Sequence, residues 1–561
     1  MMQLPPFLIF YLAAVLVLLT RGWLRTVILV ATPLLGMLNL YTMGGNGTDL
    51  AVNFANLELV LIREDRLSLI FGYLFHIAAL VSIIYALHVK DRVQQVAGVL
   101  YAGSSLGAVF AGDLLSLFLF WEMLALTSVF LVWARGTDRA YRSGMRYLLI
   151  QILSGLLLLM GLILYYHETG TLRFDYIGLE GGLYGWLMLL AFGIKCAFPF
   201  LHNWLTDAYP EATPTGTVFL SAFTTKVAVY VLARTFPGTE LLVYVGVVMA
   251  CFPIFYAVIE NDLRRVLAYS LINQLGYMVV GIGIGTSLAI NGVAAHAFAH
   301  VLYKGLLFMS MGAVLQMTGR INGSDLGGLY KTMPKTTILC IIGAASISAF
   351  PLFSGFVAKS MVMSAAIENG YSAIWFLLLF AAAGVFHHAG IKIPYFAFFA
   401  HDSGIRAKEP PFNMLLAMGI AAAFCIGIGV FPGLLYQHLP FDTDYSAYDT
   451  SHVLAQLQLL LFSALAFVWL NLRGMYPPEL RSTNLDFEWV YRRLAPCGWG
   501  ALSNGYAAVR NRVDTMISSL VAILLPTAEK LFSSNGLLSR QVAIGNMVIA
   551  CLLVFLLLLW L

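Results

Sequence analysis

The chain has 561 residues, of which 60% are hydrophobic and 11% are charged, and its formal net charge is +4. Soluble globular proteins carry about 25% charged residues, so this composition excludes a soluble domain and predicts a polytopic membrane protein. The small net charge and the absence of a basic run give no reason to expect a nucleic-acid partner.

Sixteen apolar stretches are long enough to cross a bilayer, which takes about 20 helical residues. In chain order they lie at residues 5–20, 23–42, 67–88, 93–112, 114–133, 145–166, 183–205, 213–235, 240–260, 265–286, 291–317, 337–365, 371–400, 411–435, 453–472 and 542–561. We therefore predict an all-α polytopic membrane protein with about 16 transmembrane helices. The first stretch lacks a basic segment and a cleavage site, so we expect a retained helix.

The spacing of these stretches predicts six parts. They are N-terminal transmembrane helices, two five-helix repeats, additional helices, a polar segment and a final transmembrane helix, at residues 1–92, 93–235, 240–400, 411–472, 473–541 and 542–561. Five helices per repeat is an odd number, so the second repeat must be inverted relative to the first, as in many transporters.

Charged loop residues predict the orientation. Basic residues gather in alternate loops, for example Arg135, Arg139, Arg142 and Arg146, whereas an opposite loop carries Asp442, Asp444 and Asp449. The positive-inside rule then places both termini outside the cytoplasm. Residues 473–541 mix charges with an apolar run at 516–525, which predicts an amphipathic segment lying along the cytoplasmic face. The alternative is a loose connection with one short hydrophobic patch.

Two predicted spans combine a lysine with a proline. Lys195 precedes Pro199 in the seventh span, and Lys359 follows Pro351 in the twelfth. Proline removes one helical N–H and frees a carbonyl, so we expect broken helices near both prolines. A charge at mid-bilayer costs roughly 2.5–3.5 kcal/mol on insertion scales and is seldom kept without a use. Pro-interrupted helices in two halves of a chain point to an ion site.

Further ionisable residues lie within spans. They are Glu122, Lys226, His296, His300, Lys304 and Lys392. A desolvated lysine can gain and lose a proton, and a nearby carboxylate restores its charge. Neutral histidine has one donor and one acceptor nitrogen, so it can pass protons on through water. These properties predict a proton relay.

We expect Glu122, Lys195, Lys226, His300, Lys304 and Lys359 to form this relay, with His296 and Lys392 as accessory residues. The alternative for each lysine is a structural ion pair, and for His296 a hydrogen-bonded core histidine. Lys392 lies near a span end, so its side chain could also reach the interface. The two repeats can be aligned so that Lys195 matches Lys359 and Lys226 matches Lys392.

Other chemistries find little support. His202 and Asp207 fit an H-x-x-x-x-D acyltransferase pattern, but two fixed residues match easily by chance. The six cysteines are scattered without a C-x-x-C pair, so we expect no metal site, and no nucleotide-binding glycine motif suggests a cofactor.

Residues 65–430 resemble the proton-conducting antiporter family, which is shared by multisubunit cation/proton (Mrp-type) antiporters, respiratory complex I and membrane-bound hydrogenases. The resemblance rests on Phe120-Trp-Glu122, Gly193-Ile-Lys195, Pro199-Phe-Leu-His202-Asn-Trp-Leu-Thr-Asp207-Ala-Tyr-Pro-Glu211, Leu267-Ala-Tyr-Ser-Leu-Ile-Asn-Gln-Leu-Gly-Tyr277 and His300-Val-Leu-Tyr-Lys304. It implies that Glu122 pairs with Lys195, that Lys226, His300 and Lys304 form a central axis, and that Lys359 is the terminal residue.

The sequences around Lys226 and Lys359 are most similar to those of the D-type component of Mrp antiporters. Some complex I subunits carry glutamate where this chain has Lys359, which argues against that subunit type. The part after residue 473 departs from the D-type component and resembles the end of the longest antiporter-like subunit of complex I. The resemblance implies a location in the bacterial cytoplasmic membrane.

We therefore expect a proton-translocating subunit of a sodium/proton antiporter, and a transporter rather than an enzyme. Its expected partners are other membrane subunits, membrane lipid, protons and, as a further candidate ion, Na+. One alternative is a proton-pumping subunit of a respiratory or hydrogenase complex, in which redox chemistry drives the pumping. A second alternative is a membrane partner that couples proton flux to inorganic-carbon uptake.

Overall fold

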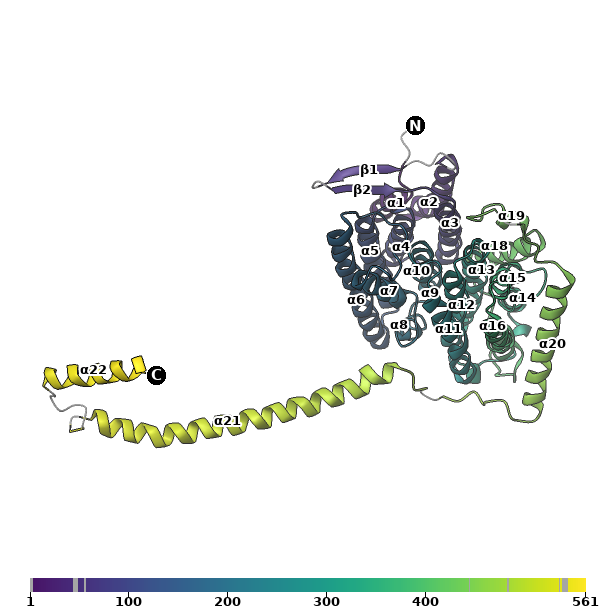
Figure 1. Ribbon diagram of the computed structural model, residues 1–561. Coiled ribbons are helices and arrows are strands. Elements are labelled where there is room, and N and C mark those ends of the chain that lie inside the picture. The colour runs from purple at the N-terminus through teal and green to yellow at the C-terminus, as the bar shows by residue number, and fades with distance from the viewer. Residues whose placement is uncertain are drawn as a thin grey trace. The chain divides into compact units, whose positions relative to one another are not determined.

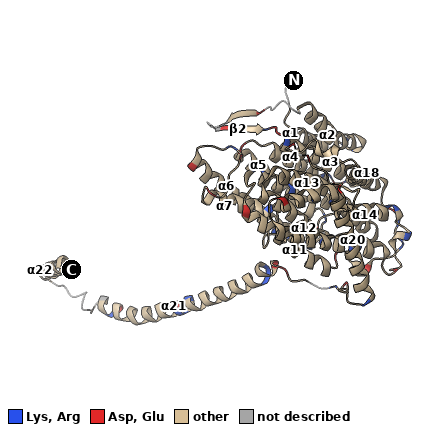
Figure 2. Ribbon diagram, turned by 45° about the vertical axis from the view of Figure 1, so that its right-hand side comes forward, with Lys and Arg blue, Asp and Glu red and all other residues tan. Residues whose placement is uncertain are grey.

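The computed structural model describes residues 4–43, 49–54, 57–442, 444–481, 484–533, 535–536 and 543–560. It forms two units, Met1–Asn484 and Leu485–Leu561. The first unit is a bundle of helices, coloured purple to green in Figure 1. Its ribbon is mostly tan in Figure 2, because charged residues are sparse along the chain.

The first unit begins with two helices and a β-hairpin. Its N-terminal elements are α1 (Pro6–Leu19), α2 (Gly22–Met43), β1 (Leu50–Phe54), β2 (Leu57–Ile62) and α3 (Arg66–Ala86). The antiparallel hairpin was not among the predicted elements. Val60 ties it to the bundle, because its N–H donates to Asp113 Oδ2 at 2.8 Å and its carbonyl accepts from Gly112 N at 2.8 Å.

Two sets of helices follow, and each contains one broken helix. The first set is α4 (Arg92–Phe110), α5 (Leu114–Trp133), α6 (Asp138–Thr169), α7 (Leu183–Lys195), α8 (Asn203–Ala208), α9 (Gly216–Ala222) and α10 (Thr224–Thr235). The second set is α11 (Glu240–Ile259), α12 (Leu263–Ile284), α13 (Ser287–Thr318), η1 (Gly323–Asp325), η2 (Leu329–Lys331), α14 (Pro334–Ile347), α15 (Ser354–Glu368), α16 (Ser372–Val385), η3 (Phe386–Ile391), α17 (Lys392–Pro394) and η4 (Tyr395–Phe399). The elements η3 and η4 are π-helical turns.

The two sets repeat the same local structure. Helices α6 and α13 each have 32 residues, begin after a capping threonine (Thr137 or Thr286) and end at a left-handed glycine (Gly170 or Gly319). The aspartates that cap α5 and α12 each form an isolated antiparallel bridge to the loop after the next helix, Asp113 to Arg173 and Asp262 to Asn322. The two sets thus share these local features, while the bounds of the two repeats and their inversion in the membrane stay a prediction.

The predicted helix breaks near Pro199 and Pro351 are also confirmed. Helix α7 ends before the first proline and α14 before the second. Each break has two non-glycine residues in the left-handed region, at φ values of 61° and 68° for Ala197 and Phe200 and of 56° and 74° for Ala349 and Leu352. Four backbone hydrogen bonds recur: 196→192, 197→194, 198→193 and 201→198 in the first break, and 348→344, 349→346, 350→345 and 353→350 in the second.

The remaining helices complete the two units. They are α18 (Phe412–Val430), α19 (Gly433–Tyr436) and α20 (Thr450–Leu472) in the first unit, and η5 (Val490–Leu494), α21 (Ala495–Phe532) and α22 (Ile544–Trp560) in the second. With 38 residues, α21 is about 57 Å long. Figure 2 shows basic and acidic positions along it. Its predicted place on the cytoplasmic face stays a prediction.

Among the described residues, 11 helices are long and apolar enough to cross a membrane. Four shorter apolar helices accompany them: α1, α7, α14 and α22. Every one of the predicted apolar stretches contains a helix, but the total of 16 crossings stays a prediction. The most buried helices are α9–α10, α12 and α13, and these carry many of the ionisable residues singled out in the sequence.

Candidate functional site

The first break positions Lys195 beside α5. Lys195 is the last residue of α7 and is fully buried. Its ammonium group donates to the carbonyl of Trp121 and lies 4.4 Å from the centre of the Trp121 ring. The next residue in α5 is Glu122, whose charge acts on Lys195 through space. The two residues that the sequence pairs therefore lie in one electrostatic environment.

A glycine in α6 makes room for the carboxylate. A Cβ added at Gly155 would overlap Oε1 of Glu122. This oxygen is buried and has no hydrogen-bond partner among the described residues. Counted from the helix caps, Gly155 in α6 occupies the position that Lys304 occupies in α13. At this position the second repeat has Lys304. The first repeat has a glycine, and the space beside it is filled by Glu122 from α5.

A short interruption positions Lys226. Helix α9 ends at Ala222 and α10 begins at Thr224, so the predicted eighth span is discontinuous. Lys226 Nζ donates to the carbonyl of Ser221 at 2.7 Å and to Thr225 Oγ1 at 3.2 Å. The interruption therefore supplies a backbone acceptor for a fully buried ammonium group.

Helix α13 carries His296, His300 and Lys304 through the buried interior. Lys304 Nζ and both ring nitrogens of His300 have no hydrogen-bond partner in the described part of the chain. An unpaired buried charge costs several kcal/mol, so these atoms need water or a neutral state. His296 has partners, because its Nε2 lies 3.0 Å from the Tyr303 hydroxyl and 3.2 Å from Gln274 Oε1.

Sequence reasoning missed the polar network around His296. The Tyr303 hydroxyl donates to Gln274 Oε1 at 3.0 Å, and Gln274 Nε2 donates to Asn273 Oδ1 at 2.6 Å. All three residues belong to the motifs of α12 and α13 quoted for the resemblance, which was the only available signal. The network links the two helices and fixes the orientation of the His296 ring.

The second break positions Lys359, and it corrects the repeat alignment. Lys359 lies in α15, and its Nζ donates to the carbonyl of Ile347 at 2.7 Å. The matched hydrogen bonds make Ile347, not Lys359, the counterpart of Lys195. The alignment of Lys195 with Lys359 was wrong because it matched lysines rather than the breaks. Each repeat presents an ammonium group at its break, but from opposite halves of the broken helix.

Four of the predicted residues and Lys359 come together at the centre of the bundle. His300 lies within electrostatic range of Lys226, Lys304, His296 and Lys359. Cys196, the residue after Lys195, lies within electrostatic range of Lys226. Lys359 lies within electrostatic range of His296, His300 and Lys304, and Lys195 lies within range of Glu122. The described residues contain no group of three or more metal-binding side chains.

Lys392 lies apart and is paired. Its Nζ is 2.9 Å from Glu479 Oε1 and donates to the carbonyls of Val258 and Glu260 at 2.6 and 2.7 Å. Lys392 is fully buried, so its side chain does not reach the interface. Glu479 belongs to residues 473–481, which we call the C-terminal strap. Arg481 of the strap donates to Asp325 at 2.8 Å and lowers the pKa of that carboxyl group.

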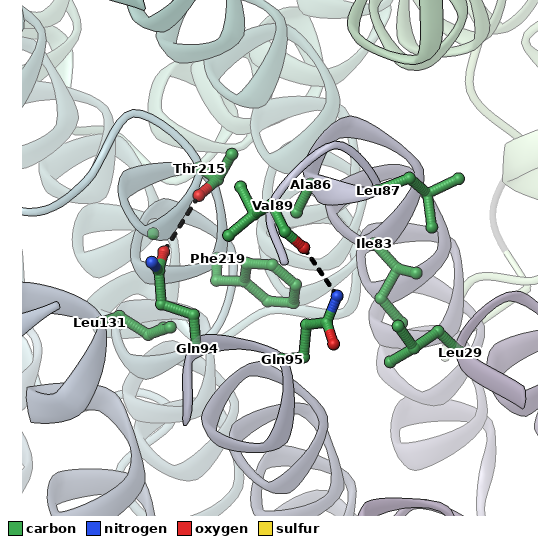
Figure 3. Close-up of a pocket in the computed structure, with 11 residues that line it drawn as sticks. Leu29, Ile83, Ala86, Leu87, Val89, Gln94, Gln95, Leu131, Thr215 and Phe219 are labelled. Atoms are coloured by element: carbon green, nitrogen blue, oxygen red, sulfur yellow. Dashed lines mark hydrogen bonds between the residues drawn. The ribbon is translucent and has the colours of Figure 1, made fainter. Parts of the chain in front are cut away.

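Two further features have structural explanations. Asp207, of the H-x-x-x-x-D pattern, pairs with Arg146 at 2.7 Å, and nearby Glu211 pairs with Arg139 at 2.6 Å. These contacts anchor α8 and the loop after it. A small cavity beside Gln94 and Thr215 has a volume of about 20 Å³, and none of its 11 lining residues is charged, so it is no candidate site (Figure 3).

The chain is similar to known proteins in sequence and in fold. Residues 111–386 match the family described as NADH:quinone oxidoreductase/Mrp antiporter, transmembrane. The chain is 31% identical to the D component of the Na(+)/H(+) antiporter of Alkalihalophilus pseudofirmus over 309 residues, which are 50% of this chain and 62% of that relative. The chain therefore spans less than two thirds of this relative's length.

Two solved structures share the fold. The Mrp complex from Dietzia sp. DQ12-45-1b superimposes with a TM-score of 0.76 and 24% identity, over 93% of this chain and 62% of that one. An archaeal respiratory membrane complex, the membrane-bound sulfane sulfur reductase, superimposes with a TM-score of 0.73 and 21% identity, over 99% of each chain. These two likenesses show the fold of the chain, and the family match covers residues 111–386, just under half of its length.

Proposed function

We propose that the chain is the proton-translocating subunit of a multisubunit monovalent cation/proton antiporter. The observation that carries the proposal is the buried line of ionisable residues between the two helix breaks. Lys195 and Lys359 each donate to a carbonyl beside or within a break, and His300 is buried within electrostatic range of Lys226, Lys304 and Lys359. Several unpaired basic groups in an apolar interior are costly, and proton transfer is the use that explains all of them.

The proposed relay works by changing which lysine is charged. When the Glu122 carboxylate lies close to Lys195, the ammonium form of Lys195 is favoured. When the carboxylate moves away, Lys195 gives its proton to water and the next basic groups. The unpartnered nitrogens of His300 and Lys304 can take part only through water, since no described side chain or backbone group forms a hydrogen bond with them. Lys359 is the last group.

The partners belong to the same proposal. We propose that the chain works with other membrane subunits in the bacterial cytoplasmic membrane, with both termini outside the cytoplasm. The similarity to the D component of a Na(+)/H(+) antiporter supports Na+ as the exchanged cation. The chain is then a transporter subunit, and its relay would serve the exchange of protons for that cation.

A redox-driven complex is the second candidate. It is favoured by the likeness in fold to a membrane-bound sulfane sulfur reductase over 99% of both chains. In that case the same relay would be driven by electron transfer in attached subunits. A proton-flux partner of an inorganic-carbon uptake enzyme remains the third candidate.

The test uses the complete complex, purified from its own membranes and placed in vesicles with an internal pH dye. An antiporter moves protons when a gradient of Na+, K+ or Li+ is imposed without any reductant. A redox-driven pump responds only when an electron donor and acceptor are added. The Glu122→Ala variant is the control, because it keeps the fold at a half-buried position and should lose either activity.

Proton movement that is unaffected by Glu122→Ala in a fully assembled complex would contradict the relay. A wild-type complex that moves protons under neither condition would contradict the transport proposal as a whole. Neighbouring genes provide an independent observation, because antiporter subunits, hydrogenase subunits and carbonic-anhydrase-like proteins would each favour one candidate.

A further inference from the structure

A cavity joins Lys359 to α20. It has a volume of about 300 Å³ and lies between α15, α16 and α20. A water molecule takes about 30 Å³ in the liquid, so the cavity has room for a chain of several waters. Its polar lining residues are Lys359, Ser360, Ser364, Ser451, His452 and Gln456. The rest of its lining is apolar.

His452 lies at the far side of this cavity and connects to the surface. Its Nε2 is 3.2 Å from the Ser364 hydroxyl, and its Nδ1 is 2.8 Å from Asp449 Oδ2. The Asp449 side chain is 50% exposed. A group that lines the cavity therefore contacts a carboxylate that meets solvent.

Helix capping does not account for the whole contact. Asp449 caps α20 through Oδ1, which accepts from the His452 N–H at 2.7 Å. A cap needs only this oxygen. The second oxygen, Oδ2, lies 2.8 Å from Nδ1 of the ring, while Nε2 lies 3.2 Å from the Ser364 hydroxyl at the cavity. The two ring nitrogens of His452 thus have different neighbours, a carboxylate at Nδ1 and the cavity serine at Nε2.

Helix α20 is fixed against the second break. Gln456 Nε2 donates to the carbonyl of Ser348 at 2.9 Å, and the Tyr448 hydroxyl accepts from the Leu352 N–H at 3.1 Å. Both hydrogen bonds satisfy backbone groups that the break leaves without helical partners. The contacts hold His452 in place relative to the half-helix that carries Lys359.

We propose that His452 and Asp449 carry protons between Lys359 and the surface that the sequence predicts to lie outside the cytoplasm. The inference rests on the proposed function and adds the route by which protons leave the relay. The Lys359 ammonium gives a proton to cavity water, and that water protonates His452 at Nε2. The imidazolium releases its Nδ1 proton through Asp449 to bulk water, and exchange of the ring protons with water restores the starting tautomer.

The main experiment is chemical rescue in the reconstituted complex. His452→Ala removes the ring next to a cavity large enough for free imidazole. Proton transport should fall on the order of 100-fold, a typical contribution of a general acid–base group. Added imidazole should restore a large part of the rate. His438→Ala is the matched control, since His438 follows α19 and does not line this cavity, and it should keep wild-type transport with no response to imidazole.

A second variant covers the case in which His452→Ala fails to assemble. His452→Gln keeps a polar side chain near Ser364 but cannot carry a proton, so it should assemble and lose transport. Asp449→Asn should slow transport less, because water can replace the carboxylate at the exposed end. A wild-type transport rate in His452→Gln would overturn the proposed exit route. A loss of transport in assembled His452→Ala that imidazole does not restore would also overturn it.

The same vesicles separate this inference from the proposed function. If Glu122→Ala abolishes transport while His452→Gln does not, the relay stands and the exit is elsewhere. If Glu122→Ala transports normally, the relay fails whatever the His452 variants do.

Discussion

The carboxylate of Glu122 occupies the space beside Gly155 that any larger residue there would fill. The glycine lies one repeat away from Lys304, at the same position between matching helix caps. The position of the glutamate is therefore set by the absence of a side chain on the neighbouring helix. At this matched position the second repeat has a basic side chain, which belongs to α13. The first repeat has an acidic side chain there, which comes from α5.

Gly155→Ala should displace the Glu122 carboxylate and reduce proton transport strongly. The overpacking should cost about 1–3 kcal/mol, which the half-buried glutamate can relieve by moving. The matched control is Gly305→Ala in α13, where no atom lies within 4 Å of the added Cβ. It should leave transport unchanged and can stabilise the helix by up to about 1 kcal/mol. Equal transport in the two alanine variants would contradict the proposed role of the Glu122 position.

Lys359→Ala should block turnover, because the cavity then lacks its basic group. Lys359→Glu should keep part of the activity, since a glutamate can also exchange a proton with the cavity water and serves at the same point in some relatives. The measurement is proton transport in vesicles at equal amounts of assembled complex. Normal transport in Lys359→Ala would make Lys359 a structural residue, and the relay would have to end elsewhere.

Glu479→Gln should destabilise the complex, because it leaves the fully buried Lys392 ammonium without its carboxylate. Breaking such a buried pair costs about 3–5 kcal/mol. The control is Arg481→Gln in the same strap, which breaks a pair whose arginine is 73% exposed and should cost no more than about 1 kcal/mol. Thermal unfolding of the purified complexes compares the two.

The double variant Lys392→Gln/Glu479→Gln provides the second arm of this test. It removes both charges and should recover much of the lost stability, because no unpaired buried charge remains. A double variant as unstable as Glu479→Gln alone would show that the ion pair is not the cause.

Native cysteines test the predicted orientation. Cys497 is exposed at the start of α21, whereas Cys196, Cys340 and Cys425 are buried. With Cys251 and Cys551 replaced by serine, a membrane-impermeant maleimide should label Cys497 only from the cytoplasmic side. Labelling only from the outside would reverse the topology deduced from the basic loops.

The sequence allowed the breaks and the buried charges to be predicted for a physical reason. Proline disrupts a helix wherever it stands, and an ionisable residue in an apolar run is visible without knowledge of its neighbours. Lys195, Lys226 and Lys304 could therefore be singled out one by one. The hairpin of β1 and β2 was not predicted, because its short strands are stabilised by contacts with the start of α5.

The rest of the site depends on contacts between distant segments. The pairing of Lys392 with Glu479 and the contact of His452 with Ser364 join residues that are 87 and 88 positions apart, and no local pattern indicates them. The space at Gly155 is likewise a property of two helices together. Sequence reasoning also aligned Lys359 with Lys195, because both are lysines near a proline. The backbone hydrogen bonds of the two breaks show a different register.

The matched breaks also bear on how the chain came to be. Left-handed conformations in residues other than glycine cost about 1–3 kcal/mol each, so two independent origins of the same four-bond pattern with the same two strained positions are hard to reconcile. The lysines, in contrast, sit on opposite sides of the two breaks. The backbone of the break is therefore what the two halves share, whereas the half-helix that carries the lysine differs between them.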